Sequence, residues 1–400
     1  MPGLSRRLSR VAVAASVQMT IKARELRASG KNVITLTTGE PNFASPPHAI
    51  EAAHRAALRG ETKYPPIDGT PDFKAAIQRK FRRDNGIDYA LDEICVGNGG
   101  KQCLFNAIMA TVDPGDEVLI PVPSWIAYAQ MTQLCEGTPV FVNCPQNNGF
   151  KPRAEDIDAA ITPKTKWLIL NSPNNPTGAV ITADEMRALA VVMRKHPHVW
   201  ILCDDMYEHL IFTGVEHATM AQVAPDLQDR TLSVSGVSKT YAMTGWRIGF
   251  AGGPRPLIKA MVNMQGQATA GISTVGMAAA VAALNGSQDG AREQSSAYQR
   301  RRDIAVEMLN AAKGITCHKP EGAFYVFPNV AGCLGHTTAG GKLLKTDEDL
   351  CLALLEEKYV ATVHGAAYHM SPYLRISTAT ADDDLIEGCR RIADFCEELR

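Results

Sequence analysis

The chain has 400 residues, too many for one typical hydrophobic core, so we expect two domains. Its 41 Lys and Arg residues balance 42 Asp and Glu residues, which argues against nucleic acid or an anionic membrane surface as a partner. No apolar run approaches the roughly 18–20 residues of a membrane span, so we predict a cytoplasmic protein without a membrane partner. The ten cysteines form no CxxC pair and no zinc-like spacing with histidine, which predicts buried free thiols in a reducing compartment and no metal site.

The first 24 residues contain no acidic side chain, which is a feature of transit peptides. The pattern runs directly into folded-looking sequence, however, and this favours an N-terminal arm that leads into a helix ending at Gly30. The middle of the chain then alternates short apolar runs, such as "KWLILN" and "VWILCD", with helical patterns over 102–112 and 183–194. This alternation predicts an α/β fold, with a mainly parallel sheet covered by helices in a large domain at 48–290.

A long helical pattern over 292–312 is followed by a different sequence pattern of short apolar runs. The runs "GITCHK", "GAFYVFP", "YVATVHG" and "PYLRIST" predict a smaller α+β domain, with helices at 346–358 and 381–398. We assign residues 1–47 and 291–400 to this second, non-contiguous domain. A ligand cleft is therefore expected between the two domains.

Ligands of such sheets bind beyond the carboxyl ends of the strands, and polar residues follow several of the predicted strands. Gly100 and Lys101 open a helix, where their N–H groups could cradle a phosphate or simply form a tight turn. Trp125 could stack on a planar ring or pack in the core. Asn175, in the rigid turn "SPNNPTGAV", could aim its amide at a ligand or stabilise the turn.

An acidic segment follows the strand "VWILC". Burying Asp204 there is costly without a cation, so this carboxylate could hold a protonated ring nitrogen. Tyr207, three residues further on, could face the same ligand. A helix N-cap is the alternative role for this segment.

The stretch "VSGVSKTYAMTGWRIGF" at 234–250 holds two cations with no acid between them. Lys239 is flanked by small residues and can lose hydration, which lowers its pKa and suits a nucleophile that forms Schiff bases. Arg247 stays charged and suits a phosphate, and Ser235 and Ser238 offer hydroxyl groups nearby. Taken together, these strand ends fit one cofactor, pyridoxal 5'-phosphate, which needs a lysine, a carboxylate, a stacking face and a phosphate cradle.

The chain resembles the class I/II pyridoxal-phosphate-dependent aminotransferases of fold type I, and among them the bacterial aspartate aminotransferase subgroup. The resemblance covers nearly all of the sequence and rests on "LTTGEPNF", "KYPPIDGTPDFKAAI", "NSPNNPTGAV", "DDMYEHL", "GVSKTYAMTGWRIGF" and "YLRIST". It implies an enzyme that moves the amino group of an L-amino acid to a 2-oxo acid by a ping-pong mechanism, with aspartate and 2-oxoglutarate favoured as substrates.

The resemblance also implies roles for single residues. Lys239 is similar to the catalytic lysine that forms the Schiff base, and Asp204 to the acid that pairs with the pyridine nitrogen. Arg375 resembles the arginine that binds the substrate α-carboxylate, with Gly39, Trp125 and Asn175 also bordering the substrate. Further cofactor contacts are implied for Tyr64, Gly100, Lys101, Trp125, Asn175, Tyr207, Ser235, Ser238 and Arg247. Tyr64 is similar to a tyrosine that reaches the neighbouring subunit's cofactor, which implies a homodimer with shared active sites.

Two departures from the family pattern concern substrate choice. Close relatives that accept aspartate or prephenate carry a lysine where we align Ala12, and Ile272 stands where proline is usual. Two alternatives therefore remain: an aminotransferase for aromatic, basic or other amino acids, and a C–S β-lyase of the same fold, which would release ammonia and pyruvate. A regulator built on an aminotransferase-like domain is less favoured, because few residues precede the first predicted strand.

Overall fold

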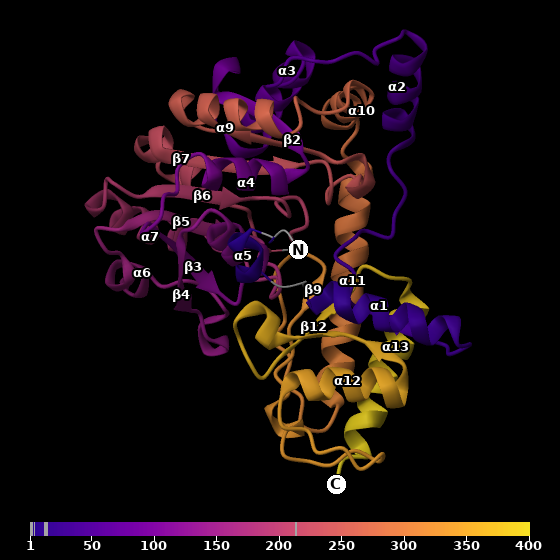
Figure 1. Ribbon diagram of the computed structural model, residues 1–400. Coiled ribbons are helices and arrows are strands. Elements are labelled where there is room, and N and C mark those ends of the chain that lie inside the picture. Colours follow the sequence, from indigo (N-terminus) through magenta and orange to yellow (C-terminus); the bar gives the residue numbers. More distant parts are fainter. Residues whose placement is uncertain (1–2, 4, 12–14, 213) are drawn as a thin grey trace.

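The computed structural model describes residues 3, 5–11, 15–212 and 214–400. Its centre is a seven-stranded sheet with the strand order β2-β8-β7-β6-β5-β3-β4 (Figure 1). The strands are β2 (Ile94–Asn98), β3 (Glu117–Val122), β4 (Thr138–Asn143), β5 (Thr165–Asn171), β6 (Trp200–Asp204), β7 (Thr231–Gly236) and β8 (Ile248–Gly252). The α/β fold expected from the sequence is confirmed.

Most neighbouring strands of this sheet are parallel, but β8 runs antiparallel to both β2 and β7. The connection between β7 and β8 spans only residues 237–247, fewer than the dozen or so residues that a parallel crossover requires. The chain therefore turns back at the carboxyl end of β7. This turn places Lys239 and Arg247 at the edge of the sheet where ligands of parallel sheets bind.

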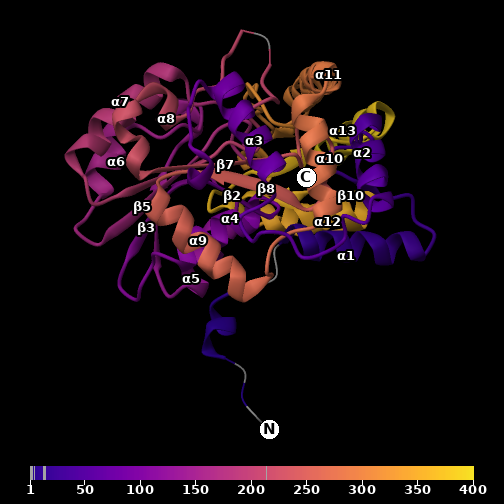
Figure 2. The same ribbon diagram turned by 90° about the horizontal axis from the view of Figure 1, so that it is seen from above.

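Helices cover both faces of the sheet (Figure 2). One face packs against α4 (Gly100–Met109), α5 (Ala127–Leu134) and α9 (Arg255–Ala268), and the other against α6 (Ala154–Ala160), α7 (Ala183–Lys195) and α8 (Met220–Val223). A third apolar cluster joins α2 (Pro47–Leu58), α3 (Pro71–Lys80) and α10 (Thr274–Asn285) to β2 and β8. Because both faces are covered, β5, β6 and β7 are buried along nearly their whole length.

The C-terminal part of the chain forms a separate core together with the N-terminal helix. It contains a three-stranded sheet, β11 (Val363–His364), β12 (Leu374–Ser377) and β9 (Tyr325–Val326), and the parallel pair β1 (Ile34–Thr35) and β10 (Val360–Ala361). Its helices are α1 (Ala15–Ala28), α11 (Asp289–Ala311), α12 (Asp347–Lys358) and α13 (Asp382–Glu397). "GITCHK" forms no strand, since only Thr316 makes an isolated bridge, to Asn329. The division at 47/48 and 290/291 stays a prediction.

The N-terminal arm differs in part from the expectation that residues 1–47 pack with the C-terminal part. The short 3-10 helix η1 (Arg6–Arg10) lies beside α5 instead, where Arg10 pairs with Glu136 at 3.3 Å (Figure 2). Its residues are all exposed, and Arg7 also lies within ion-pair distance of Glu136. The remaining short helical turns are Phe81–Asn85, Leu91–Glu93, Gln146–Asn148, Pro225–Arg230, Thr244–Trp246, Ala331–Cys333 and Gly365–Tyr368.

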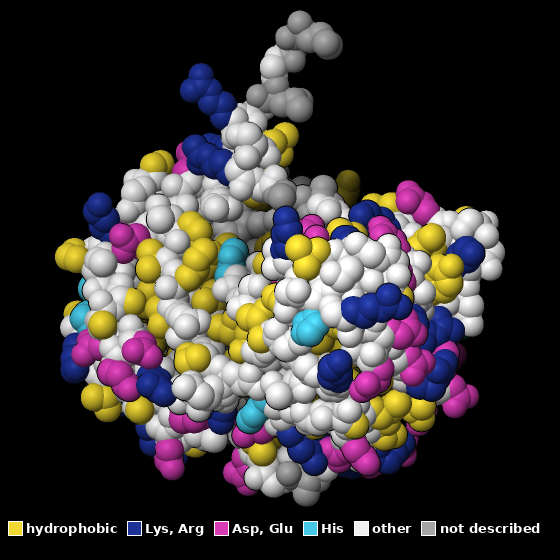
Figure 3. Space-filling model, turned by 90° about the horizontal axis from the view of Figure 1, so that it is seen from below, with side chains coloured by type: hydrophobic (Ala, Val, Ile, Leu, Met, Phe, Trp, Pro, Cys, Tyr) yellow, Lys and Arg dark blue, Asp and Glu magenta, His cyan; other side chains and the backbone are white. Residues whose placement is uncertain are grey.

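Three further observations concern the cysteines, the surface and the helices. All ten cysteines are buried free thiols. Basic and acidic side chains are interspersed over the face seen from below (Figure 3). Across the described part of the chain, no helix combines the length and the apolar character that a bilayer crossing demands.

Candidate active site

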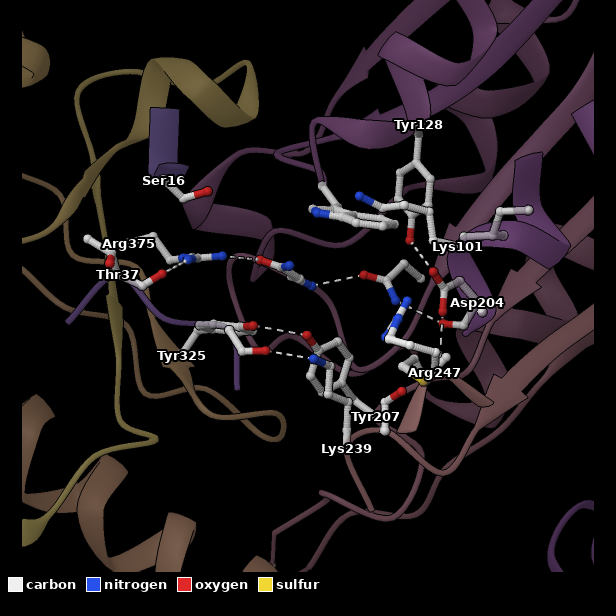
Figure 4. Close-up of a pocket in the computed structure, with 18 residues that line it drawn as sticks. Ser16, Thr37, Lys101, Tyr128, Asp204, Tyr207, Lys239, Arg247, Tyr325 and Arg375 are labelled. Carbon is white, nitrogen blue, oxygen red and sulfur yellow. Dashed lines mark hydrogen bonds between the residues drawn. The ribbon is translucent and has the colours of Figure 1, made fainter. Parts of the chain in front are cut away.

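A cavity of about 300 Å³ lies at the carboxyl ends of β5, β6 and β7 and is bordered on its other side by β9, β12 and the N-terminal segment (Figure 4). Its lining combines residues that are far apart in the sequence: Ser16, Thr37, Gly39, Gly100, Lys101, Leu104, Trp125, Tyr128, Asn171, Asn175, Asp204, Met206, Tyr207, Ser238, Lys239, Arg247, Tyr325 and Arg375. All but two of the site residues predicted from the sequence are in this set.

The two exceptions are Ser235 and Tyr64. Ser235 points away from the cavity and donates a hydrogen bond to Glu208 at 2.6 Å. Side chains alternate along a strand, and Val234 packs toward α4, so its neighbour Ser235 must face the opposite side of the sheet. Placing Ser235 at the ligand was therefore wrong, whereas Ser238 borders the cavity. Tyr64 lies outside the cavity and is 93% exposed.

Lys239 lies in the turn between β7 and β8, with its amine inside the cavity. Its Nζ donates to the carbonyl oxygen of Gly39 at 2.6 Å. Burial lowers the pKa of Lys239 to about 8; the cations of Arg247 and Arg375 also lower it, while Glu40 and Asp204 oppose the shift. A sizeable fraction of this amine is therefore neutral near pH 8, as a nucleophile or a base must be.

Asp204 ends β6 and is the one carboxylate among the described residues that line the cavity. Tyr128 donates to its Oδ2 at 2.7 Å, and the amide of Met206 donates to its Oδ1 at 3.3 Å. Asn171 holds the same segment by donating to the Asp204 carbonyl at 2.8 Å. Burial raises the pKa of Asp204 to about 6, although the two donors to its carboxylate oppose that shift. A cationic group placed beside this carboxylate would keep it ionised.

Two cations border the end of the cavity nearest the start of α4. Arg247 donates to the carbonyl oxygens of Thr244 at 2.8 Å and Asn98 at 3.1 Å. A Cβ atom at Gly99 would approach the Arg247 guanidinium to 2.4 Å, and residue 99 has a φ of 78°, so glycine suits this position on both counts. The ammonium of Lys101 lies 4.7 Å from the centre of the Trp125 ring, and burial and the charge of Arg247 lower its pKa. The Arg247 guanidinium and the free N–H groups of the α4 N-terminus together suit a phosphate, and the Lys101 ammonium is a second cation at this end.

Arg375 borders the opposite end of the cavity, on β12, and is 4% exposed. Its guanidinium donates to the carbonyl of Thr37 and, at 3.2 Å, to Oδ1 of Asn175. Its Nε is buried without a hydrogen-bond partner in the described part of the protein. A guanidinium with an unused buried donor is suited to a carboxylate, which can accept two parallel hydrogen bonds.

The family model described as aminotransferase class I and II matches residues 31–392. The chain belongs to this family. Aspartate aminotransferase of Rhizobium meliloti (strain 1021) is 52% identical over 393 residues, which cover 98% of this chain and 96% of that protein. Aspartate/prephenate aminotransferase of Cereibacter sphaeroides is 52% identical over 396 residues, covering 99% of both chains.

Solved structures agree with this assignment to the aminotransferases. The crystal structure of the aspartate aminotransferase from Rhizobium meliloti has a TM-score of 0.98 and 51% identity, covering 100% of both chains. The aspartate aminotransferase from Thermus thermophilus with maleate has a TM-score of 0.92 and 39% identity, covering 99% of this chain and 100% of that one. The described residues of this aminotransferase therefore have the fold of these structures.

Several residues of the aminotransferase cavity are not foreseen from the sequence. Tyr325 belongs to an apolar strand pattern that favours a core position, yet its hydroxyl lies 3.0 Å from that of Tyr207. Asn171, the last residue of β5, carries no motif that separates it from an ordinary strand end. Thr37 and Ser16 reach the cavity through the N-terminal segment. Contacts between distant segments bring all four residues to the site, and no local pattern records such contacts.

Of the two family departures, only one falls in the described part of the aminotransferase. Ile272 is 5% exposed and packs in the cluster of α2, α3 and α10. Ala12, which we align with a lysine of close relatives, lies outside the described residues.

Proposed function

We propose that this aminotransferase uses pyridoxal 5'-phosphate to move the amino group of an L-amino acid, aspartate foremost, to a 2-oxo acid. One observation carries the proposal: Lys239, with a pKa of about 8, and Asp204 border the same cavity, between the cations of Arg247 and Arg375. In the described residues, neither arginine has a carboxylate within ion-pair distance. The cavity thus offers a base, an acid and two separate anion sites in one place.

The donor set fits the cofactor group by group. Asp204 would hold the protonated ring nitrogen, and Asn175 and Tyr207 would donate to the ring oxygen. Trp125 offers a face for stacking on the ring. The phosphate would bind at Gly100, Lys101, Ser238 and Arg247, where N–H groups, a hydroxyl and a guanidinium converge. When bound, pyridoxal phosphate supplies an aldehyde that takes up the amino group and a protonated ring that accepts the electrons released at Cα.

The side chains of the enzyme carry out the remaining tasks. Arg375 would bind the α-carboxylate and so hold the substrate Cα near Lys239. The neutral amine of Lys239 would remove the proton from Cα and then deliver it to the cofactor carbon that carried the aldehyde, acting first as a base and then as an acid. Asp204, kept ionised by the ring N–H⁺, would hold the ring in its cationic form. Two such half-reactions in succession give ping-pong kinetics, since the first oxo acid leaves before the second enters.

Lys101 supports an acidic substrate. Its ammonium borders the cavity, over Trp125, and no carboxylate pairs with it in the part of the chain that the structure describes. A side-chain carboxylate of aspartate or 2-oxoglutarate could pair with this cation. Relatives with about half of the residues identical are named aspartate or aspartate/prephenate aminotransferases, which supports the same assignment.

A homodimer completes the proposal, with Tyr64 reaching the cavity of the partner subunit. Tyr64 is 93% exposed beside a groove of about 800 Å³ that α2 and α10 also border. On α2, which borders this groove, Leu58 is also 74% exposed. A second copy that covers this face would bury both side chains. Light scattering of the purified protein should then give twice the mass of one chain.

The decisive experiment combines spectroscopy with a substrate panel. The purified protein should be yellow, or become so with added pyridoxal phosphate, and should transfer the amino group of aspartate to 2-oxoglutarate faster than that of aromatic or basic donors. Release of ammonia and pyruvate from a cysteine conjugate would favour the C–S β-lyase alternative. A protein that forms no chromophore with pyridoxal phosphate would sink the proposal.

A further inference from the structure

Tyr325 touches both halves of the cavity. It lies on β9 and is 1% exposed. Its hydroxyl is 3.0 Å from the hydroxyl of Tyr207, which lies just beyond β6 in the large sheet (Figure 4). The face of its ring lies 4.6 Å from the guanidinium carbon of Arg375, on the neighbouring strand β12. One side chain therefore contacts both the residue proposed to bind the ring oxygen and the residue proposed to bind the substrate carboxylate.

The position of the Tyr325 hydroxyl depends on Gly39. A Cβ atom at residue 39 would come within 2.7 Å of that oxygen. Glycine at this position therefore leaves the hydroxyl room to reach Tyr207. The carbonyl of the same glycine accepts the hydrogen bond from Lys239. Residue 39 therefore serves the site in two ways, through its carbonyl oxygen and through the space left by the absence of a side chain.

The direction of the bond between the two tyrosines follows from counting protons. A tyrosine hydroxyl has one proton to donate and lone pairs to accept with. If Tyr207 donates its proton to the ring oxygen of the cofactor, the Tyr207 hydroxyl can only accept in its hydrogen bond with Tyr325. Tyr325 is then the donor. A donor at this place polarises the Tyr207 hydroxyl and strengthens the bond that it makes in turn.

We propose that Tyr325 is a positioning residue that holds the Tyr207 proton toward the cofactor ring oxygen and links this bond to Arg375. The inference rests on the proposed function, because it needs the cofactor in the cavity. Asn175 provides a direct link between the two halves, through its 3.2 Å bond to Arg375. Tyr325 provides the second, which passes through its ring and its hydroxyl.

Tyr368 offers a matched comparison. Its ring also lies against Arg375, at 5.2 Å, and is buried. Its hydroxyl, unlike that of Tyr325, has no bond to Tyr207 in the structure. Removing one hydroxyl from each tyrosine therefore separates the proton-positioning role from simple packing on the arginine. The charged groups around the pair, Asp204, Lys239 and Arg375, are unchanged in both variants.

The test is a pH titration of the absorbance of the bound cofactor in the wild type, Tyr325→Phe and Tyr368→Phe. A weaker bond to the ring oxygen disfavours negative charge there, so the midpoint of Tyr325→Phe should rise by about 0.5 pH unit, the size expected for one neutral hydrogen bond. Its kcat should fall about fivefold with KM for aspartate and Kd for maleate within about twofold, because phenylalanine keeps the ring against Arg375. Tyr368→Phe should leave the midpoint unchanged.

A double-mutant comparison gives the second measurement. In a Tyr207→Phe background the hydroxyl of Tyr325 has nothing to position, so adding Tyr325→Phe should not move the midpoint further. An unchanged midpoint in Tyr325→Phe, an equal shift in Tyr368→Phe, or additive shifts in the double variant would each overturn the inference. A wild type without any pH-dependent cofactor absorbance would instead overturn the proposed function.

Discussion

Two buried charged regions lie on either side of the segment that follows β6. On one side is the cavity, with the basic side chains of Lys101, Lys239, Arg247 and Arg375 and with Asp204 as the one carboxylate among its described lining residues. On the other is a cluster that we call the ionic cluster, formed by Lys80, Asn85, Glu208 and Ser235. There the Lys80 ammonium lies 2.5 Å from Glu208 and 2.7 Å from Asn85, and the Glu208 carboxylate also accepts from Asn85 and Ser235.

The two regions treat their charges differently. Burial alone would raise the pKa of Glu208, but the Lys80 ammonium and neighbouring histidines hold it down at about 2, so this carboxylate is ionised and paired. Burial raises the pKa of Asp204 to about 6 and lowers that of Lys239 to about 8, because neither has a full counter-charge. Buried charges paired within the chain hold the fold together, whereas buried charges without partners reserve a place for a ligand.

The largest effect is expected from removing the cavity's base. Lys239→Ala should lower the kcat of amino transfer by more than about 10⁴-fold, because both proton transfers depend on that amine. A coupled assay of oxaloacetate release measures it, with the exposed Lys259→Ala as the control. Activity within tenfold of the wild type would show that another group moves the proton.

A change in the ionic cluster should act on stability instead. Glu208→Gln leaves the Lys80 ammonium buried without a counter-charge, so the free energy of unfolding should fall by about 3–5 kcal/mol. Urea denaturation measures this loss. Asp226→Asn breaks an exposed pair with Arg194 and should change stability far less. Equal effects of the two substitutions would contradict the distinction between the regions.

The uncompensated carboxylate of Asp204 should appear as a pH dependence in the cofactor-free protein. Its folded pKa of about 6 exceeds the ordinary value of 3.8, so between these pH values the folded state binds more protons than the unfolded state. Stability from this group is therefore present below pH 4 and is lost as pH rises to about 6, by at most about 3 kcal/mol. Asp204→Asn should remove this component, which urea denaturation at pH 4.5 and 7 would reveal. Parallel behaviour of wild type and variant would refute the assignment.

The smallest expected effect concerns substrate choice. Lys101→Met keeps the stem of the side chain but removes its charge, so kcat/KM for aspartate should fall about 10- to 100-fold, the size of a lost charged hydrogen bond. The value for phenylalanine should change little, which makes it an internal control. Steady-state kinetics with both donors decides the matter, and an equal loss for both would assign Lys101 to the cofactor phosphate alone.

The sequence predicts the fold class and the place of the site well, for a local reason. Asn175 and Lys239 each follow a buried strand and Asp204 ends one, and the carboxyl ends of parallel strands meet at one edge. The orientation of β8 and the side of the sheet that Ser235 faces depend on strand pairing, which a single strand does not record. From the sequence alone Tyr325 is expected in the hydrophobic core. Its polar partner, Tyr207, lies more than a hundred residues away in the chain, so no local pattern indicates the contact. The roles of the single site residues stay predictions.

The pairing of β1 with β10 bears on how the chain acquires its structure during synthesis. Ile34 lies opposite Val360, so this strand pair cannot form until almost the whole polypeptide has left the ribosome. All seven strands of the central sheet come from residues 94–252 and can pair much earlier. Leu36 and its apolar neighbours in the N-terminal segment therefore stay exposed until β10, one of the last segments to be synthesised, becomes available. A chain that ends at residue 350 lacks β10, so we expect it to need a chaperone. Its central sheet should nevertheless already resist proteolysis.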